Sequence, residues 1–338
     1  MTRRGDTLLF DAPPTVAAWA AAGGKKESEG PLASAFDFVT QDAAFGEQGC
    51  ENWEQAESLL QRKAVELCLR KADIPRSKVD IAFAGDLQAQ CTASNYTMRE
   101  LGIPFAGVYG ACSTMAETLG LAAVFAAGGM AERVLALTSS HFCAAERQFR
   151  TPLEYGAKRT PTAQWTATAA GACLVRAHGS VGVPVLSVTF GRVQDFAVHD
   201  INNMGAAMMP AAASTLLRYF SATGTSPQDF DAIFTGDLGE VGTALLHEQM
   251  AKEGLLLDNH KDCGCLLYDT NSQNVQAGGS GAGCSAAVLC GKILPMLAAG
   301  QLRRVLFLAT GALMSQTTFL QGESIPGIAH CVELGGAV

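Results

Sequence analysis

The chain has 338 residues, more than one average domain and fewer than three. Hydrophobic residues make up 48% of it and charged residues 17%, which favours a large folded core and excludes wholesale disorder. The formal net charge of −8 argues against a general electrostatic nucleic-acid binder, so we expect no nucleic-acid partner. No apolar run reaches the roughly 20 residues of a membrane span, and the N-terminus lacks the apolar core of a signal peptide. We expect a soluble chain that something else would hold at a membrane.

The eleven cysteines are scattered through apolar stretches. The closest pair, Cys263 and Cys265, has no matching second pair, so the sequence predicts no zinc site and no other metal site. Most of these residues are expected to be small buried hydrophobic side chains in a reducing compartment.

The first half of the chain alternates between predicted helices and strands. Residues 51–71 place leucines and valine at helical spacing, which predicts an amphipathic helix. Residues 79–87, VDIAFAGDL, are a β-branched and aromatic run closed by a Gly-Asp turn, which predicts a buried strand. Residues 103–109 predict another strand. Residues 110–140 then predict a glycine-rich turn, an apolar helix and a further strand.

The middle of the chain continues the alternation. Residues 165–178 predict a strand with a break at Gly171, and we expect residues 184–193 to be its antiparallel neighbour. Residues 204–222 predict the helix that opens the second half.

Two segments of the first half recur, in the same order, in the second. Residues 79–87 match residues 230–238, FDAIFTGDL, and residues 110–140 match residues 281–311. Two ordered matches indicate an internal duplication. We expect two α/β halves, residues 1–195 and 196–338, with mixed sheets packed about a pseudo-twofold axis. The apolar helices that follow the two glycine-rich turns are nearly free of charge, so both are expected to lie between the two sheets.

Cys112 follows the strand of residues 103–109 and stands where a helix begins. Backbone N–H groups without helical partners and the positive end of the helix dipole favour a thiolate there, and they can hold a carboxylate or an oxyanion. A buried structural cysteine beside a tight turn is an equally weighted alternative.

The Gly-Ala-Cys-Ser turn at Cys112, the central apolar helix and the duplication resemble the thiolase superfamily, which includes the ketoacyl-acyl-carrier-protein synthases. The resemblance implies a thiolase-like fold with αβαβα layers, and in that superfamily the matching cysteine is the acyl-accepting nucleophile. Over nearly its whole length the chain resembles, more narrowly, the stage V sporulation protein AD family. The segments that carry this resemblance are residues 30–37, 84–87, 109–118, 138–156, 235–242, 277–286 and 309–313.

The second half lacks the groups that a condensing enzyme needs beside its nucleophile. In the condensing enzymes of the superfamily, a histidine ends the first core strand of this half, and a Gly-His or Gly-Asn turn precedes its central helix. The matching residues 235–238 and 278–281 contain neither His nor Asn. The sequence therefore favours binding over turnover. The alternatives are an acyltransferase with Cys112 as nucleophile and His141 as base, and a scaffold with a vestigial pocket.

The narrower resemblance implies a ligand and a setting. It implies binding of dipicolinic acid (pyridine-2,6-dicarboxylate) for uptake into the developing spore and for release in germination. It also implies a peripheral place at the inner membrane of the forespore and spore, with other stage V A sporulation proteins as partners. A homodimer is implied too. No cofactor is expected, and calcium only as a chelate with dipicolinate.

The expected ligand contacts follow from the chemistry of a flat dianion. The helix N-terminus at Cys112 and Ser113 offers N–H donors, and the guanidinium groups of Arg147 and Arg150 offer two forks for carboxylates. His141 is expected to reach the same cleft.

Further candidates carry open alternatives. Phe142, Phe149 and Tyr155 are expected to flank the pyridine ring. Asp86 could contact a chelated metal ion, although we expect it, with Asp237, to cap the helix that follows it. For Arg147 and Arg150 the alternative is an ion pair with Glu146 or Glu154.

Overall fold

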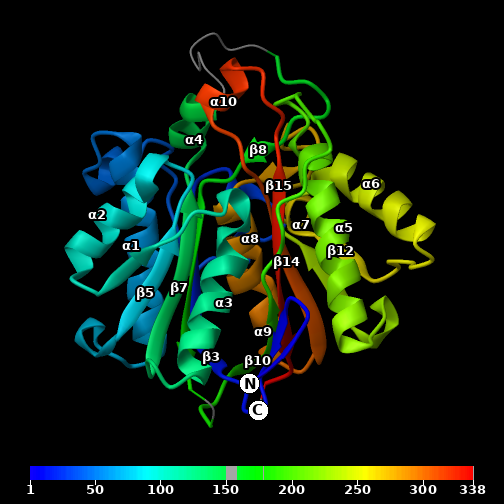
Figure 1. Ribbon diagram of the computed structural model, residues 1–338. Coiled ribbons are helices and arrows are strands. Elements are labelled where there is room, and N and C mark those ends of the chain that lie inside the picture. Colours follow the sequence, from blue (N-terminus) through cyan, green and yellow to red (C-terminus); the bar gives the residue numbers. More distant parts are fainter. Residues whose placement is uncertain (150–157, 178, 338) are drawn as a thin grey trace.

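Two β-sheets stand side by side in the protein, with helices on their outer faces and between them (Figure 1). The computed structural model describes residues 1–149, 158–177 and 179–337. Helices α1 and α2 cover the outer side of the first sheet, α5 and α6 cover that of the second, and α3 and α8 lie between the sheets. The layering is the expected αβαβα arrangement. The longer helices are α1 (Trp53–Lys71), α2 (Thr92–Leu101), α3 (Thr114–Ala127), α4 (Phe142–Phe149), α5 (Met204–Thr223), α6 (Gly239–Lys252) and α8 (Ala282–Val288).

The two sheets repeat one strand order. It is β6-β5-β7-β9-β3 in the first and β12-β11-β14-β15-β10 in the second. In each sheet the two pairings at the outer edge are parallel and the others are antiparallel. The strands are β3 (Thr15–Gly23), β5 (Ile81–Gly85), β6 (Phe105–Gly107), β7 (Arg133–Ser140), β9 (Ala169–Arg176), β10 (Val183–Thr189), β11 (Ala232–Thr235), β12 (His260–Asp262), β14 (Arg304–Ala312) and β15 (Gly327–Gly335).

The partner expected for residues 184–193 was wrong. β10 pairs with β15, with β2 (Thr7–Leu9) and, at its first residues, with β3. β9 is already paired on both sides, by β3 and β7, and has no free edge for β10. β10 therefore holds in the second sheet the place that β3 holds in the first, although it precedes the expected division at residue 195.

Helix α1 begins where its sequence provides a cap. The Asn52 side chain accepts a hydrogen bond from the backbone N–H of Gln55 at 2.9 Å, and the helix then runs to Lys71. Leu60 and Val65 on its inner side are fully buried against the first sheet. The expected amphipathic helix is thus confirmed, with a start two residues inside the expected one.

The buried position of the two central helices, α3 and α8, explains why they carry almost no charged residues. Met115, Leu119 and Ala123 of α3 are fully buried, in one cluster with residues of both sheets. α8 approaches β9 so closely that a Cβ on Gly171 would lie 2.6 Å from the carbonyl oxygen of Ala286. The placement of both helices between the sheets is confirmed.

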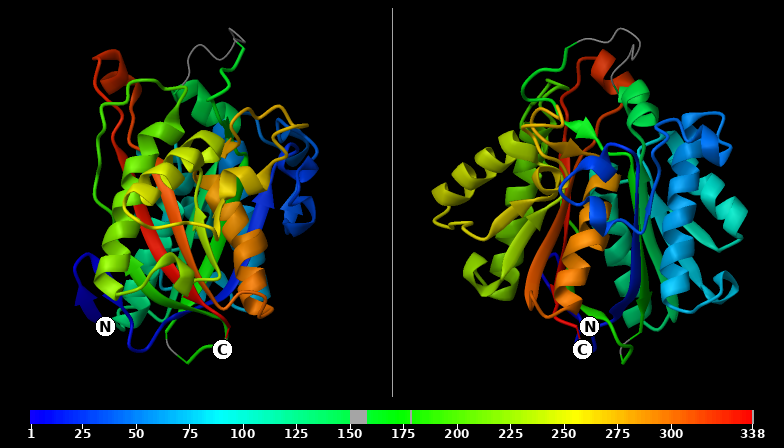
Figure 2. Two further views of the ribbon diagram at one scale, coloured as in Figure 1. Left: turned by 90° about the vertical axis from the view of Figure 1, so that its right-hand side faces the viewer. Right: turned by 180° about the vertical axis from the view of Figure 1, so that it is seen from behind.

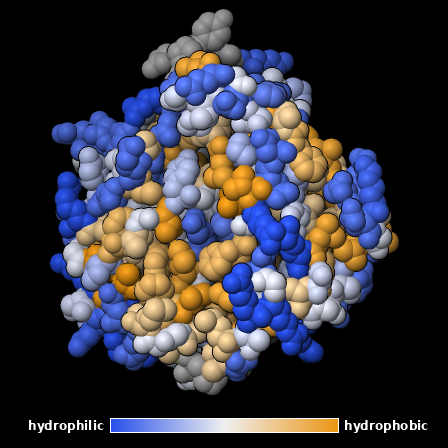
Figure 3. Space-filling view, viewed as in Figure 1, coloured by the Kyte–Doolittle hydropathy of each residue, from blue (hydrophilic) through white to orange (hydrophobic). Residues whose placement is uncertain are grey.

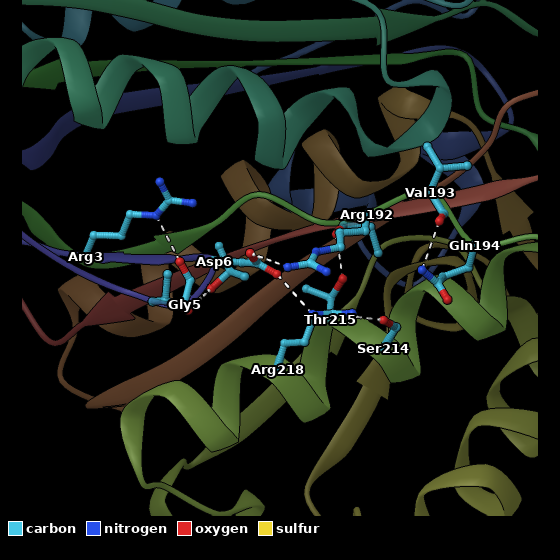
Figure 4. Close-up of polar contacts among 12 residues, drawn as sticks. Arg3, Gly5, Asp6, Arg192, Val193, Gln194, Ser214, Thr215 and Arg218 are labelled. Carbon is cyan, nitrogen blue, oxygen red and sulfur yellow. Dashed lines mark hydrogen bonds and ion pairs between the residues drawn. The ribbon is translucent and has the colours of Figure 1, made fainter.

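The N-terminal hairpin is held by ion pairs to Arg192 and to α5 of the second half (Figure 4). β1 (Thr2–Arg4) and β2 form the hairpin, and Asp6 lies at its turn. The Asp6 carboxylate contacts Arg192 at 2.9 Å and Arg218 of α5 at 3.3 Å.

Both chain ends lie at the same end of the molecule (Figure 2).

Candidate functional site

Cys112 lies in a tight elbow between β6 and α3. Ala111, directly before it, has a left-handed φ of 52°, which is unusual for a residue other than glycine. The Ser113 hydroxyl donates to the Gly110 carbonyl at 2.6 Å, and the Thr114 hydroxyl donates to the Ala111 carbonyl at 2.7 Å. These two bonds hold the elbow in its strained shape.

The elbow packs directly against the second half of the protein. Gly311 of β14 lies so near that a Cβ there would be 2.3 Å from the Gly110 carbonyl oxygen and 3.0 Å from the Ser113 nitrogen. The thiol of Cys112 is therefore presented at the junction of the two halves.

Asp237 is the acidic partner of Cys112. It follows β11, is fully buried and lies beside Cys112, whose thiol pKa its charge raises. The Thr310 hydroxyl donates to its Oδ1 at 2.8 Å. The Ser280 hydroxyl and the Gly281 N–H each donate to its Oδ2 at 3.0 Å. Three residues from two separate segments of the second half thus fix the carboxylate under the elbow of the first.

The pair of groups is a thiol beside a carboxylate. Burial, followed by the charge of Asp237 and by the hydrogen bond to it, raises the pKa of the Cys112 thiol well above its ordinary value. This is opposite to the thiolate-favouring effect expected of a helix N-terminus. Burial also raises the pKa of Asp237 to about 6, against the lowering effect of its hydrogen bonds from Cys112, Gly281 and Thr310. At neutral pH the thiol therefore keeps its proton, while the neighbouring carboxyl group is mostly ionised.

A narrow pocket of about 60 Å³ opens beside Cys112. Glu146 of α4 is the one carboxylate in its lining and is 3% exposed, and it contacts Arg159 at 2.8 Å and accepts from the Thr166 hydroxyl at 2.9 Å. The lining is mostly apolar. Its lining consists of Leu87, Ala111, Cys112, Ala145, Glu146, Phe149, Thr166, Met204, Met208, Ser280, Ala312 and Met314.

Of the residues expected from the sequence to bind a ligand, only Cys112 and Phe149 line this pocket among those described. Ser113 is buried and bonded to Gly110. Arg147 is half exposed, forms an ion pair with Glu54 and lies over the ring of Trp53 at 5.2 Å from its centroid. Its partner is thus on α1, whereas the ion pair considered from the sequence was with Glu146 or Glu154. Arg150, Glu154 and Tyr155 lie outside the described residues.

His141 is buried behind the pocket wall. Its Nδ1 accepts the Ala144 N–H at 3.5 Å, and its ring contacts Phe45 at 5.8 Å between centroids. Burial lowers the pKa of His141 to about 4, so the ring is neutral. Phe142 stacks on Trp165 at 3.9 Å between centroids.

The two pseudo-symmetric aspartates behave differently. Asp86 accepts the Gln88 N–H at 3.0 Å and the Ser94 N–H at 2.8 Å, which caps α2 as expected. Asp237 does not cap the helix after it, α6. The first N–H groups there donate to Asp262 instead, at 2.8 Å from Leu238 and 3.0 Å from Gly239.

Sequence reasoning missed two buried acids near these sites. Glu57 of α1 lies beside Asp86, and burial, with the Asp86 charge as the second cause, raises its pKa to about 8. Glu117 lies one turn into α3, and a Cβ on Gly110 would come within 2.6 Å of its Oε2. Burial raises the pKa of Glu117 to about 7. An acidic residue in an otherwise apolar helix was the one available signal for Glu117.

The fold and the cysteine elbow define a thiolase-like protein. A structure of 3-oxoacyl-acyl-carrier-protein synthase III from Aquifex aeolicus VF5 is similar over 95% of this chain and 99% of that one, with a TM-score of 0.58 and 13% identity. A structure of OleA from Xanthomonas campestris is similar over 99% of both chains, with a TM-score of 0.61 and 12% identity. At such identities the likeness shows the fold alone.

The sequence comparison narrows the class to one family. The family model for stage V sporulation protein AD matches residues 4–335. Stage V sporulation protein AD of Bacillus subtilis strain 168 is 42% identical over 337 residues, which is 98% of each chain. This chain therefore belongs to the stage V sporulation protein AD family, as the sequence motifs indicated.

No helix in the described part of the chain is long and apolar enough to cross a membrane. Within the same residues, no group of three or more His, Cys, Asp or Glu side chains is arranged to hold a metal ion.

Proposed function

We propose that this sporulation protein binds dipicolinic acid in the pocket beside Cys112, without catalysis. In this proposal it serves uptake of the acid into the developing spore and its release in germination. It acts peripherally at the inner membrane of the forespore and spore, with other stage V A sporulation proteins as partners. The observation that carries the binding-only part is the partner of Cys112, which is the carboxylate of Asp237 rather than a basic group.

Acyl transfer needs a nucleophile that loses its proton at neutral pH. A carboxylate with a pKa of about 6 is a weak base for a thiol whose own pKa is raised well above the ordinary value. His141 is not placed to accept the Cys112 proton, because its Nδ1 accepts a hydrogen bond from the Ala144 N–H and the residue does not line the pocket. The elbow therefore presents Cys112 to the pocket, but the surroundings of the thiol favour its protonated, unreactive form.

The lining of the pocket matches the chemistry of one flat ring with polar substituents, and its volume of about 60 Å³ requires the walls to move apart when such a ligand enters. Met204, Met208 and Phe149 supply apolar walls, and the Cys112 thiol and the Ser280 hydroxyl supply polar groups. The protein's own negative charge at the pocket is reduced in two ways, which lowers its repulsion of a dicarboxylate. Arg159 neutralises the Glu146 carboxylate at the pocket wall, and Asp237 can take up a proton near pH 6.

Calorimetry with dipicolinate tests the proposal. We expect one-to-one binding to the unmodified protein. In Cys112→Ala we expect moderately weaker binding, because backbone donors and apolar walls remain. In Met208→Glu, which places a charge on the apolar wall, we expect binding to be lost. Absence of heat at millimolar dipicolinate in the unmodified protein would remove the proposal and leave the scaffold alternative.

The acyltransferase alternative rests on the Cys112 thiol, which opens into a pocket from a strained elbow. Incubation with a panel of acyl-coenzyme A thioesters, followed by mass spectrometry of the Cys112 peptide, separates the two functions. The proposal requires that peptide to remain unmodified. Acylation that is stable or turned over at Cys112 would establish the alternative.

A further inference from the structure

Two histidines face each other on the second half of the protein, among residues that do not line the Cys112 pocket. His247 lies on α6, and His260 begins the edge strand β12. The Nε2 of His247 and the Nδ1 of His260 are 3.0 Å apart. The rings are 5.1 Å apart between centroids, with an interplanar angle of 68°.

A chain of hydrogen bonds fixes which nitrogen of His260 carries the proton. The Thr235 hydroxyl donates to Oδ2 of Asp262 at 2.7 Å, so its oxygen is left to accept from Nε2–H of His260 at 2.8 Å. The Asp262 carboxylate is itself held by the N–H groups of Leu238 and Gly239. The Nδ1 lone pair of His260 therefore points at His247.

We propose that His247 and His260 form a site for a divalent transition-metal ion of the zinc, copper and nickel class. Imidazole nitrogens bind these ions at about 2.0–2.1 Å, which places two ligating nitrogens about 3 Å from each other. The two rings already meet this separation. The exposed His247 needs only to turn its Nε2 from His260 toward a shared ion, and water fills the remaining positions.

The surroundings match those of a ligating imidazole. A histidine ligand commonly donates its second ring N–H to an oxygen that is itself hydrogen-bonded, which fixes the ring's direction. Thr235 and Asp262 provide that support for His260 from two neighbouring strands, β11 and β12. An ion here would join α6 to the edge of the second sheet. Calcium and magnesium prefer oxygen ligands and are not expected to bind.

Calorimetry on the chelator-treated full chain tests the site, with Zn²⁺, Ni²⁺ and Ca²⁺ as separate probes. We expect Zn²⁺ and Ni²⁺ to bind one-to-one and Ca²⁺ not to bind. His247→Ala and His260→Ala should each abolish this binding, whereas His199→Ala, which removes an exposed histidine of another segment, should leave it unchanged. Binding that persists in the His247→Ala, His260→Ala double variant would show an adventitious ion only and overturn the proposal.

Two further readouts separate ligation from general surface binding. Electron paramagnetic resonance of one equivalent of Cu²⁺ should show two coordinated nitrogens in the unmodified protein and one in His247→Ala. Thr235→Val keeps both ligands but removes the support of His260, and it should weaken metal affinity about 10- to 100-fold. An unchanged nitrogen count in His247→Ala would contradict the site. Dipicolinate binding should be the same in all these variants, so the outcome is independent of the proposed function.

Discussion

The carboxylate of Asp237 lies beside Cys112, and this single residue affects the chemistry open to the thiol. An imidazole would accept the thiol proton, whereas the charge of Asp237 raises the thiol pKa. The sequence showed the absence of histidine at residues 235–238. It did not show that Asp237 contacts Cys112, because that contact depends on how the two halves close on each other.

The first prediction concerns the reactivity of Cys112. Asp237→Asn removes the negative charge beside the thiol, so its pKa should fall and its alkylation at neutral pH should become faster. Timed iodoacetamide labelling with peptide mapping measures the rate at Cys112 itself. The half-buried Cys143 of α4 serves as an internal reference, whose rate should not change. A slower reaction at Cys112 in the variant would contradict the assigned electrostatic role of Asp237.

The second prediction concerns pH and the proposed ligand. A bound dianion repels the Asp237 carboxylate, so binding favours the protonated form of that group. Protonation increases as pH falls through about 6, the pKa of Asp237 in the free protein. Dipicolinate affinity should therefore strengthen between about pH 8 and pH 6, a change that Asp237→Asn should largely abolish. Calorimetry across this range measures the slope, and an affinity that weakens toward pH 6 would place the ligand elsewhere.

At the scale of the elements, local patterns carried the assignment of helices and strands, while pairing and contacts did not follow from them. The helix expected at residues 51–71 and the one at residues 204–222 both formed, because spacing and capping are local. The predicted pairing of β10 was wrong because its actual partner, β15, lies far along the chain and no local pattern indicates it. Arg147 similarly pairs with Glu54 across elements, which no local pattern indicates.

The third prediction tests the contact between β14 and the elbow. Gly311→Ala places a Cβ 2.3 Å from the Gly110 carbonyl oxygen, so β14 or the elbow must shift. Such overpacking costs about 1–3 kcal/mol, which should lower the thermal midpoint and weaken dipicolinate binding together. Gly336→Ala is the matched control, since its nearest neighbour would be 3.5 Å away. Equal stability of the two variants would show that the close approach is not a constraint.

At the scale of the whole molecule, two features of the first half remain open to a second copy. Strand β6 ends the order of its sheet, and no strand among the described residues pairs with its other edge. Apolar side chains also gather over α3 in Figure 3. Leu121 and Val124 of this helix are only partly buried. An unpaired edge and an apolar surface in the same half are typical of a protein interface.

The fourth prediction is that the protein is a homodimer joined through this half. A charge on the apolar face must be desolvated when the two copies meet, so Val124→Glu should shift the protein toward a monomer. Val181→Glu, at an 83% exposed position in the loop before β10, supplies the same change outside α3 and should leave the dimer intact. Sedimentation velocity over a range of protein concentrations measures both, with circular dichroism to show that each variant is folded. A folded, unmodified protein that sediments as a monomer at every concentration would rule out the homodimer. A dimer that tolerates Val124→Glu as well as Val181→Glu would instead place the interface away from α3, and the unpaired edge of β6 would then be the surface to vary next.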